Sequence, residues 1–271
     1  MRTAVRAVAR MIPPAARAVR RARRQPRLTI IAWHRFDEIP GGLSTPTDVF
    51  RGQLEALAHW GATVLPLEDC SDGQARRSLP ARAVALTFDD GYASVLEAAW
   101  PLLKDCGLPA TLFVVSGYVD GRRRFPWDAE NADAQHTRLS DMDEILQAAD
   151  DGLAIGSHTV THRWLPGLDI VDLHQEMVES RAALEGQLGR PVRSIAYPMG
   201  GWNRAVRNAA ATAGYRIGVT VDRGVNSPRR DPLALRRSVA PPTIKDFELM
   251  LDGAYTWLRP VDQLRSRRVS R

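Results

Sequence analysis

The sequence has only two cysteines among 271 residues and no long apolar run. Cys70 and Cys106 make no disulfide framework, and their spacing fits no thiolate metal site. Because no stretch of about 18 consecutive apolar residues occurs, no membrane-spanning helix is expected. The arginine-rich N-terminus lacks the apolar segment of a cleavable secretory signal. Together these absences favour reduced thiols and a cytoplasmic location.

Positive charge is concentrated at the two ends of the sequence. Residues 1–27 contain nine arginines and no acid, and residues 259–271 contain five arginines and one aspartate. Because the whole chain carries a net charge of +6, the stretch 28–258 between these ends carries −7. A nucleic-acid-binding protein has its basic surface on the folded domain, so nucleic acid is not expected as the main partner.

The basic arm, residues 1–27, has apolar residues at helical spacing among its arginines. Such a segment can lie on an anionic membrane surface, which would put the protein at the inner face of the membrane. A solvated, disordered tail is the alternative. We therefore expect three parts: this arm, a catalytic domain over residues 28–258 and a basic tail over residues 259–271.

From residue 28 onward, short apolar stretches alternate with helical patterns. Strands are predicted over residues 28–33, 83–88, 110–115, 153–156, 194–197, 215–221 and 235–239, and helices over 49–60, 94–106, 140–152, 170–188, 203–213 and 244–258. Alternation of strand and helix indicates a parallel α/β sheet or barrel. About seven repeats suit a distorted, incomplete (β/α) barrel of the TIM type.

Polar residues directly follow four of the predicted strands. They are His34, the Asp89-Asp90 pair, His158 and the segment 197–200. In α/β barrels the active site assembles at the carboxyl ends of the strands. These four clusters, distant in the sequence, are therefore expected to converge at one rim of the barrel.

Two of these clusters have the residue types of a metal site. Asp89 and Asp90 repel one another unless a cation or a proton lies between them, although they could instead cap the following helix. His158 and His162 are four residues apart, so over one helical turn both imidazoles would face a metal; core packing or chance is the alternative. Two imidazoles with one carboxylate form an open, catalytic type of site.

This ligand set indicates a metal-dependent hydrolase. It favours Zn²⁺, and Co²⁺, Ni²⁺, Mn²⁺ and Fe²⁺ are also chemically compatible. A metal held in this way lowers the pKa of a bound water from about 15.7 towards 7. The aspartate that is not a ligand can then take the proton of this water as a general base.

Three segments resemble motifs of the polysaccharide deacetylase (NodB-homology) family, carbohydrate esterase family 4. They are residues 87–91 (TFDDG), 157–162 (SHTVTH) and 197–200 (YPMG), in the order of the family. The resemblance covers about residues 28–240. It implies a distorted (β/α) barrel that removes the N-acetyl group from N-acetylhexosamine units of a saccharide or polysaccharide.

The resemblance also implies a role for individual residues of the first two motifs. Carried over position by position, it makes Asp89 the base and Asp90 a metal ligand. His158 and His162 would be the other two ligands. This assignment predicts that the protein binds an N-acetylated saccharide as its substrate.

The third motif and one aromatic residue are expected at the substrate. The motif places Tyr197 and Met199 there, and the backbone N–H of Met199 would help to hold the oxyanion, which does not depend on the side chain. Trp127 lies in the irregular stretch 117–138, where its ring could stack on a sugar face. An ordinary packed tryptophan is the alternative.

The sequence departs from the family pattern in two places. Ala196 stands where the family often has an arginine that tunes the base. The late Leu-x-His motif that supplies the general acid is missing, because no histidine follows His174. Some members resemble a circularly permuted arrangement with this histidine on the first strand, and residues 32–36 (AWHRF) fit it. We therefore expect His34 to protonate the leaving amine, with a structural histidine as the alternative.

Two other functions compete with a deacetylase. A glycosidase needs two carboxylates roughly 5–9 Å apart on opposite sides of the glycosidic bond, an arrangement that the adjacent Asp89 and Asp90 suit poorly. A non-catalytic carbohydrate- or membrane-binding barrel would have no need of a base beside a complete ligand set. The sequence thus favours a metal-dependent carbohydrate N-deacetylase.

Overall fold

The computed structural model describes residues 27–38, 43–128 and 137–254. The predicted basic arm, apart from Arg27, and the predicted tail over 259–271 lie outside the described residues. Residues 255–258 of the last predicted helix lie outside them too. Among the described residues, none of the helices combines the length and apolar character that a membrane crossing requires.

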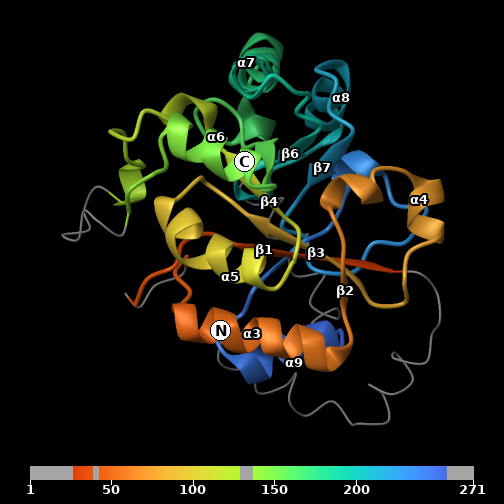
Figure 1. Ribbon diagram of the computed structural model, residues 1–271. Helices are drawn as coiled ribbons and strands as arrows, with labels where there is room; N and C mark the ends of the chain where they lie inside the picture. The colour runs from red at the N-terminus through yellow and green to blue at the C-terminus, as the bar shows by residue number, and fades with distance from the viewer. Residues whose placement is uncertain (1–26, 39–42, 129–136, 255–271) are drawn as a thin grey trace.

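A parallel sheet forms the centre of the molecule (Figure 1). Its strands are β1 (Leu28–Trp33), β2 (Thr63–Val64), β3 (Ala83–Phe88), β4 (Ala110–Val114), β5 (Ala154–Ser157), β6 (Ser194–Ala196), β7 (Ile217–Val219) and β8 (Ser238–Val239). The strand order is β7-β6-β5-β4-β3-β1-β8, and β2 pairs with β3 beside this path. Each of these strand pairs is parallel, so the carboxyl ends of the strands share one rim.

The two edges of the sheet meet through a single bridge. Leu235 donates its N–H to Gly218 and accepts the N–H of Thr220, both at 2.8 Å, which makes a parallel bridge to Val219 on β7. Three residues further on, β8 pairs with β1. The sheet therefore curls into a distorted, incomplete barrel, and the predicted fold class is confirmed.

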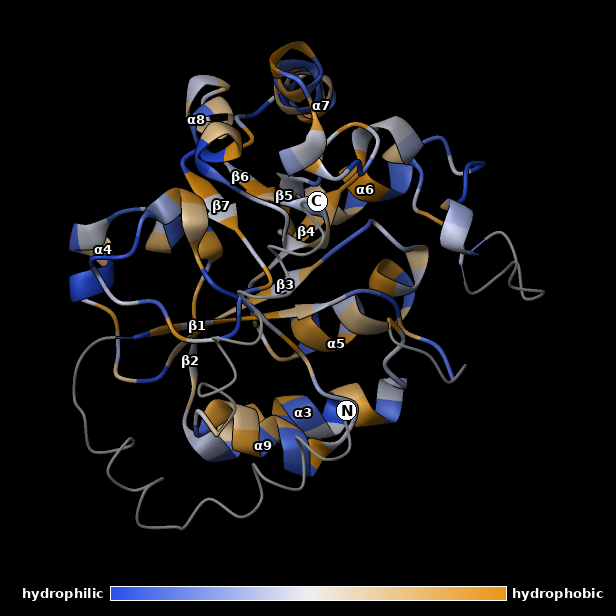
Figure 2. Ribbon diagram, turned by 180° about the vertical axis from the view of Figure 1, so that it is seen from behind, coloured by the Kyte–Doolittle hydropathy of each residue, from blue (hydrophilic) through white to orange (hydrophobic). Residues whose placement is uncertain are grey.

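Seven α-helices surround this sheet within the described residues. They are α3 (Thr47–Trp60), α4 (Gly73–Arg77), α5 (Trp100–Asp105), α6 (Met142–Asp150), α7 (Ile170–Leu188), α8 (Arg204–Thr212) and α9 (Ile244–Leu251). Figures 1 and 2 show α3 and α9 side by side at one end of the molecule and α7 and α8 at the other. β1 and β3 are buried along their whole length, as continuous apolar strands of parallel sheets are.

The helices predicted over 140–152 and 94–106 begin differently in the structure. Asp141, rather than Ser140, caps α6, because its carboxylate accepts the N–H of Glu144 while Glu144 accepts the N–H of Asp141. The predicted helix over 94–106 starts as a π-helical stretch, η2 (Val95–Ala99), and continues as α5. Pro101 lies at this junction and has no N–H for a regular helical hydrogen bond.

Candidate active site

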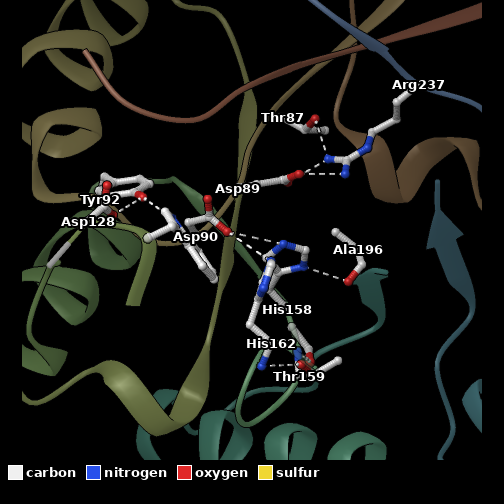
Figure 3. Close-up of polar contacts among 12 residues, drawn as sticks. Thr87, Asp89, Asp90, Tyr92, Asp128, His158, Thr159, His162, Ala196 and Arg237 are labelled. Atoms are coloured by element: carbon white, nitrogen blue, oxygen red, sulfur yellow. Dashed lines mark hydrogen bonds and ion pairs between the residues drawn. The ribbon is translucent and has the colours of Figure 1, made fainter. Parts of the chain in front are cut away.

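The paired aspartates end β3 and point in different directions. Asp90 has a left-handed backbone (φ 74°), and Gly91 after it is also left-handed (φ 79°). Such a conformation is rare for a residue with a side chain and is concentrated at functional sites. Figure 3 shows the Asp89 carboxylate directed at Arg237 and the Asp90 carboxylate directed at the two histidines.

Asp90, His158 and His162 converge on one point. The Oδ1 atom of Asp90 lies 3.4 Å from the Nε2 atom of each histidine. One donor atom from each residue can be chosen so that all lie within 4.8 Å of one another. Asp90 Oδ1 is buried and has no hydrogen-bond partner among the described residues. A buried carboxylate oxygen facing two imidazole nitrogens suits a shared cation.

The two histidines reach this point from a loop, so the expected helical turn is wrong. The segment 158–164 after β5 is neither helix nor strand. Instead, Thr159 (φ 70°) and His162 (φ 59°) have left-handed backbones, and His162 donates its N–H to the Thr159 hydroxyl at 3.1 Å. Two changes of backbone direction, rather than helical periodicity, bring the ring centroids of His158 and His162 to 4.8 Å from each other.

A buried glutamate on α7 holds this loop. Glu176 accepts the N–H groups of Val160 and Thr161 at 2.8 and 3.0 Å and also the Thr161 hydroxyl. From the other side, Ser116 and Gly117 donate their N–H groups to carbonyls of the same loop. No motif in the sequence identifies Glu176. The apolar residues at positions 173, 177 and 184 lie on the same side of α7 as Glu176, and this helical spacing indicates that the carboxylate is buried.

Hydrogen bonding and burial set the protonation of the two rings. The His158 Nδ1 atom donates to the Ala196 carbonyl at 2.7 Å, which directs Nε2 towards Asp90. Burial opposes protonation of His158, but the carboxylates of Asp90 and Asp89 outweigh it and raise its pKa. Burial and the charge of His158 lower the pKa of His162 to about 4. His162 is therefore neutral at physiological pH, as a metal ligand must be.

Asp89 is paired with an arginine that no sequence motif identifies. Arg237 is fully buried and donates to both oxygens of Asp89, at 2.6 and 2.7 Å. It also donates to the Thr87 hydroxyl and to the Thr220 carbonyl. Arg237 lies in the predicted strand over 235–239, and a buried guanidinium in such a strand requires an acidic partner. The position of Arg237 in this strand therefore indicates that it pairs with an acidic residue.

The guanidinium of Arg237 determines the charge of Asp89. Burial alone would raise the pKa of Asp89, but Arg237 and the neighbouring His158 outweigh this effect. The pKa of Asp89 therefore lies well below its usual range, and this carboxylate is ionised at neutral pH. Ala196 stands where the family often has an arginine that tunes the base. In this structure Arg237, directly before the edge strand β8, contacts Asp89 instead.

His34 lies directly after β1 and is partly exposed. Its charge contributes to lowering the pKa of both Asp89 and Asp90, so the structure places it beside the aspartate pair. Its neighbour Arg35 is buried. His34 therefore combines access to solvent with a position next to the carboxylates.

Trp127 forms an aromatic wall beside His162. It belongs to η4 (Pro126–Asp128), is 44% exposed and stacks on Phe125 with a centroid distance of 4.4 Å. The centroid of its ring lies 5.0 Å from that of His162. Its indole N–H donates to the Tyr92 hydroxyl at 3.3 Å. Burial, and next the charge of Asp90, raise the pKa of Tyr92 well above its usual range, so this hydroxyl stays protonated.

The two residues expected from the third motif have different environments. Met199 lies in η6 (Pro198–Gly200), has a left-handed backbone (φ 55°) and is 55% exposed. Tyr197 is fully buried, and its hydroxyl donates to the Leu233 carbonyl at 2.8 Å. The side chain of Tyr197 therefore packs beneath the surface of the site and offers no contact to a substrate.

Sequence comparison matches the chain to one family profile and, among others, to two bacterial proteins. A family profile described as polysaccharide deacetylase matches residues 76–218, just over half of the chain. A Bacillus subtilis protein named as a polysaccharide deacetylase, YxkH, is 27% identical over 212 residues, 78% of this chain and 70% of that protein. A poly-β-1,6-N-acetyl-D-glucosamine N-deacetylase of Staphylococcus aureus is 33% identical over 70 residues, 26% of this chain and 24% of that enzyme.

Two solved structures have a similar fold. The deacetylase PplD of Streptococcus pyogenes, solved in complex with acetate, gives a TM-score of 0.72 at 24% identity, covering 84% of this chain and 99% of that chain. IcaB from Ammonifex degensii gives a TM-score of 0.72 at 24% identity, covering 84% of this chain and 97% of that chain. These similarities concern the arrangement of the barrel.

Proposed function

Since this chain belongs to the polysaccharide deacetylase family, we propose that it is a metal-dependent hydrolase that removes N-acetyl groups from N-acetylhexosamine units of a saccharide. The observation that carries this proposal is the convergence of Asp90, His158 and His162 beside an ionised Asp89. Three ligands with an uncoordinated carboxylate next to them are what a hydrolytic metal site requires.

The donor set fits a divalent cation such as Zn²⁺. Asp90 Oδ1 is a buried oxygen without a hydrogen-bond partner among the described residues, and the two Nε2 atoms face it. The Ala196 carbonyl orients His158, as second partners of ligating histidines do. When bound, the cation supplies Lewis-acid activation of water and of the acetamide carbonyl. Co²⁺, Ni²⁺, Mn²⁺ and Fe²⁺ suit the same donors.

The residues around this point divide the proton transfers between them. Asp89, oriented by Arg237, accepts the proton of the attacking water. The backbone N–H of Met199, a residue that is 55% exposed, helps to hold the oxyanion. His34 donates a proton to the nitrogen as the amide C–N bond breaks. The products are acetate and a free amino sugar.

Trp127 supports a saccharide as the substrate. Its exposed ring lies beside His162, and an aromatic face can cover the apolar face of a sugar ring. The Staphylococcus aureus relative is named as a poly-β-1,6-N-acetyl-D-glucosamine N-deacetylase. Oligomers of N-acetylglucosamine are therefore the first substrates to examine.

An acetate-release assay with metal reconstitution tests this proposal. The protein is treated with a chelator, reloaded with one divalent cation at a time and incubated with N-acetylglucosamine oligomers of several linkages. We expect acetate to be released, the activity to disappear with chelator and to return with metal, and the chain length of the oligomer to stay unchanged. Shortened oligomers would indicate a glycosidase, and saccharide binding without any acetate would indicate a non-catalytic barrel.

A further inference from the structure

One buried carboxylate, that of Asp128, joins three segments of the active-site rim. Its Oδ1 atom accepts from the Arg35 guanidinium at 3.0 Å, and its Oδ2 atom accepts from the Tyr92 hydroxyl at 2.6 Å. Arg35 follows His34 at the end of β1, and Tyr92 follows Asp90 at the end of β3. Figure 3 shows Tyr92 and Asp128 next to Asp90.

The burial of this network shows that its geometry is fixed. Asp128 is 1% exposed, Arg35 is 5% exposed and Tyr92 is fully buried. A buried charge is tolerated only when it is paired and hydrogen-bonded. Both oxygens of Asp128 are satisfied, and Arg35 also forms an ion pair with Asp37 at 2.8 Å. The carboxylate is therefore held in one position by its two partners, Arg35 and Tyr92.

The network ends on the exposed aromatic wall. Tyr92 donates to Asp128 and accepts the indole N–H of Trp127 at 3.3 Å. Phe125 stacks on the indole with an interplanar angle of 10°, while Trp127 keeps 44% of its surface exposed. The polar edge of this indole is thus held by Tyr92 and one face by Phe125. The rest of the ring is available to a ligand beside His162.

We propose that Asp128 and Tyr92 are positioning residues that hold Trp127 as a stacking platform for one sugar ring of the substrate. Through Arg35, the same carboxylate fixes this platform relative to the segment that carries His34. The inference rests on the proposed function, because it assumes that a saccharide enters this rim. It adds that recognition of the sugar ring and delivery of the proton depend on one buried framework.

A consequence distinguishes this role from simple stabilisation of the fold. If Tyr92 acts through the Trp127 ring, removing its hydroxyl loosens the platform and weakens saccharide binding, while the metal ligands stay in place. Tyr92→Phe keeps the packing of the ring and removes only the hydroxyl. The variant loses the hydrogen bond to Asp128 and the one from the Trp127 indole. Loss of the Trp127 bond corresponds to about a three- to tenfold rise in KM, with kcat reduced much less.

The test is a double-mutant cycle of Tyr92→Phe, Trp127→Phe and the two changes combined. We measure kcat and KM for acetate release from an N-acetylglucosamine tetramer, together with metal content and melting temperature. Trp127→Phe has no indole N–H, so adding Tyr92→Phe to it should change KM by less than twofold. Tyr215→Phe is the matched control, because it loses a buried hydroxyl that donates to the Met177 carbonyl at 3.0 Å; we expect its KM to equal that of the wild type.

Three results would overturn the inference: an unchanged KM in Tyr92→Phe, effects that multiply in the combined variant, or a fall in kcat alone that follows the loss of folded protein. Acetate release by the wild type tests the proposed function separately. If the wild type releases none, the same four proteins are compared by their Kd for the intact tetramer in calorimetry. In that case, adding Tyr92→Phe to Trp127→Phe should change Kd by less than twofold. A larger change would overturn the inference.

Discussion

Arg237 and Asp89, 148 residues apart in the sequence, form a buried bidentate ion pair with N–O distances of 2.6 and 2.7 Å. Two parallel hydrogen bonds fix the orientation of a carboxylate as well as its charge. Because Asp89 is the proposed base, Arg237 sets both the direction in which this base points and the pH range in which it is ionised.

Arg237→Lys should keep a positive charge near Asp89 but lose the bidentate geometry. We expect kcat to fall roughly 10- to 100-fold, or about 1.4–2.7 kcal/mol of transition-state stabilisation. Arg237 counters the effect of burial on the pKa of Asp89, so weakening the pair raises this pKa. Activity requires ionised Asp89, and the acidic limb of the pH–rate profile should therefore move to higher pH.

A control for this variant is Arg207→Lys on α8. Arg207 also forms two hydrogen bonds with an aspartate, Asp231, at 2.8 and 3.3 Å, but this pair is partly exposed. We expect Arg207→Lys to leave kcat and the pH–rate profile unchanged. An Arg237→Lys profile that coincides with that of the wild type would remove Arg237 from the control of the base.

Asp90→Asn and His162→Ala should each abolish metal binding. The substitutions remove one of three ligands that converge at one point, so we expect less than one tenth of the wild-type metal content by elemental analysis and no measurable acetate release. His174→Ala, at an exposed position of α7, is the matched histidine control and should retain metal and activity. Full metal content in either ligand variant would contradict the ligand set.

His34→Ala should separate catalysis from metal binding. General acid catalysis contributes typically 10²- to 10⁴-fold, so kcat should fall at least about 100-fold while the metal content stays at the wild-type level. His59→Ala, an exposed histidine on α3, provides the control. Unchanged turnover in His34→Ala would remove this residue from the mechanism and leave it a structural role.

Glu176→Gln should loosen the loop that carries both histidines. The carboxylate accepts three hydrogen bonds from Val160 and Thr161, and the loss of such support typically costs 10- to 100-fold in metal affinity. A chelator competition assay measures this change. Glu179 is exposed on the same helix, so the control variant Glu179→Gln should bind metal like the wild type. Equal affinities of the two variants would show that the loop keeps its shape without Glu176.

The sequence predicts the barrel well because its signals are local. Each main strand is a short apolar run, and the polar residues at its carboxyl end identify the rim where His34, Asp90 and His158 meet. Most element boundaries shift by a few residues, as with Asp141 in place of Ser140 as the cap of α6, but the last predicted helix, over 244–258, already ends at Leu251. Such shifts depend on which of two neighbouring side chains reaches a backbone N–H.

The parts of the site that the sequence does not reveal depend on distant segments. The spacing of His158 and His162 suggests a helix, whereas left-handed backbone at Thr159 and His162 produces the same convergence. Glu176 and Arg237 act on residues of other elements, and no short motif records these pairings. Tyr197 belongs to a recognised motif, but its hydroxyl donates to the Leu233 carbonyl and its side chain is buried.

The bridge between Leu235 and Val219, where the two edges of the sheet meet, lies two residues before Arg237. This bridge consists of two backbone hydrogen bonds, and the segment that forms it is continuous with the one that aligns the base. Because Arg237 also donates to the Thr220 carbonyl beside this bridge, we expect opening of the bridge to displace the guanidinium. We therefore expect the proposed acetate release to depend on barrel closure, so that mild denaturation lowers it while most of the secondary structure persists.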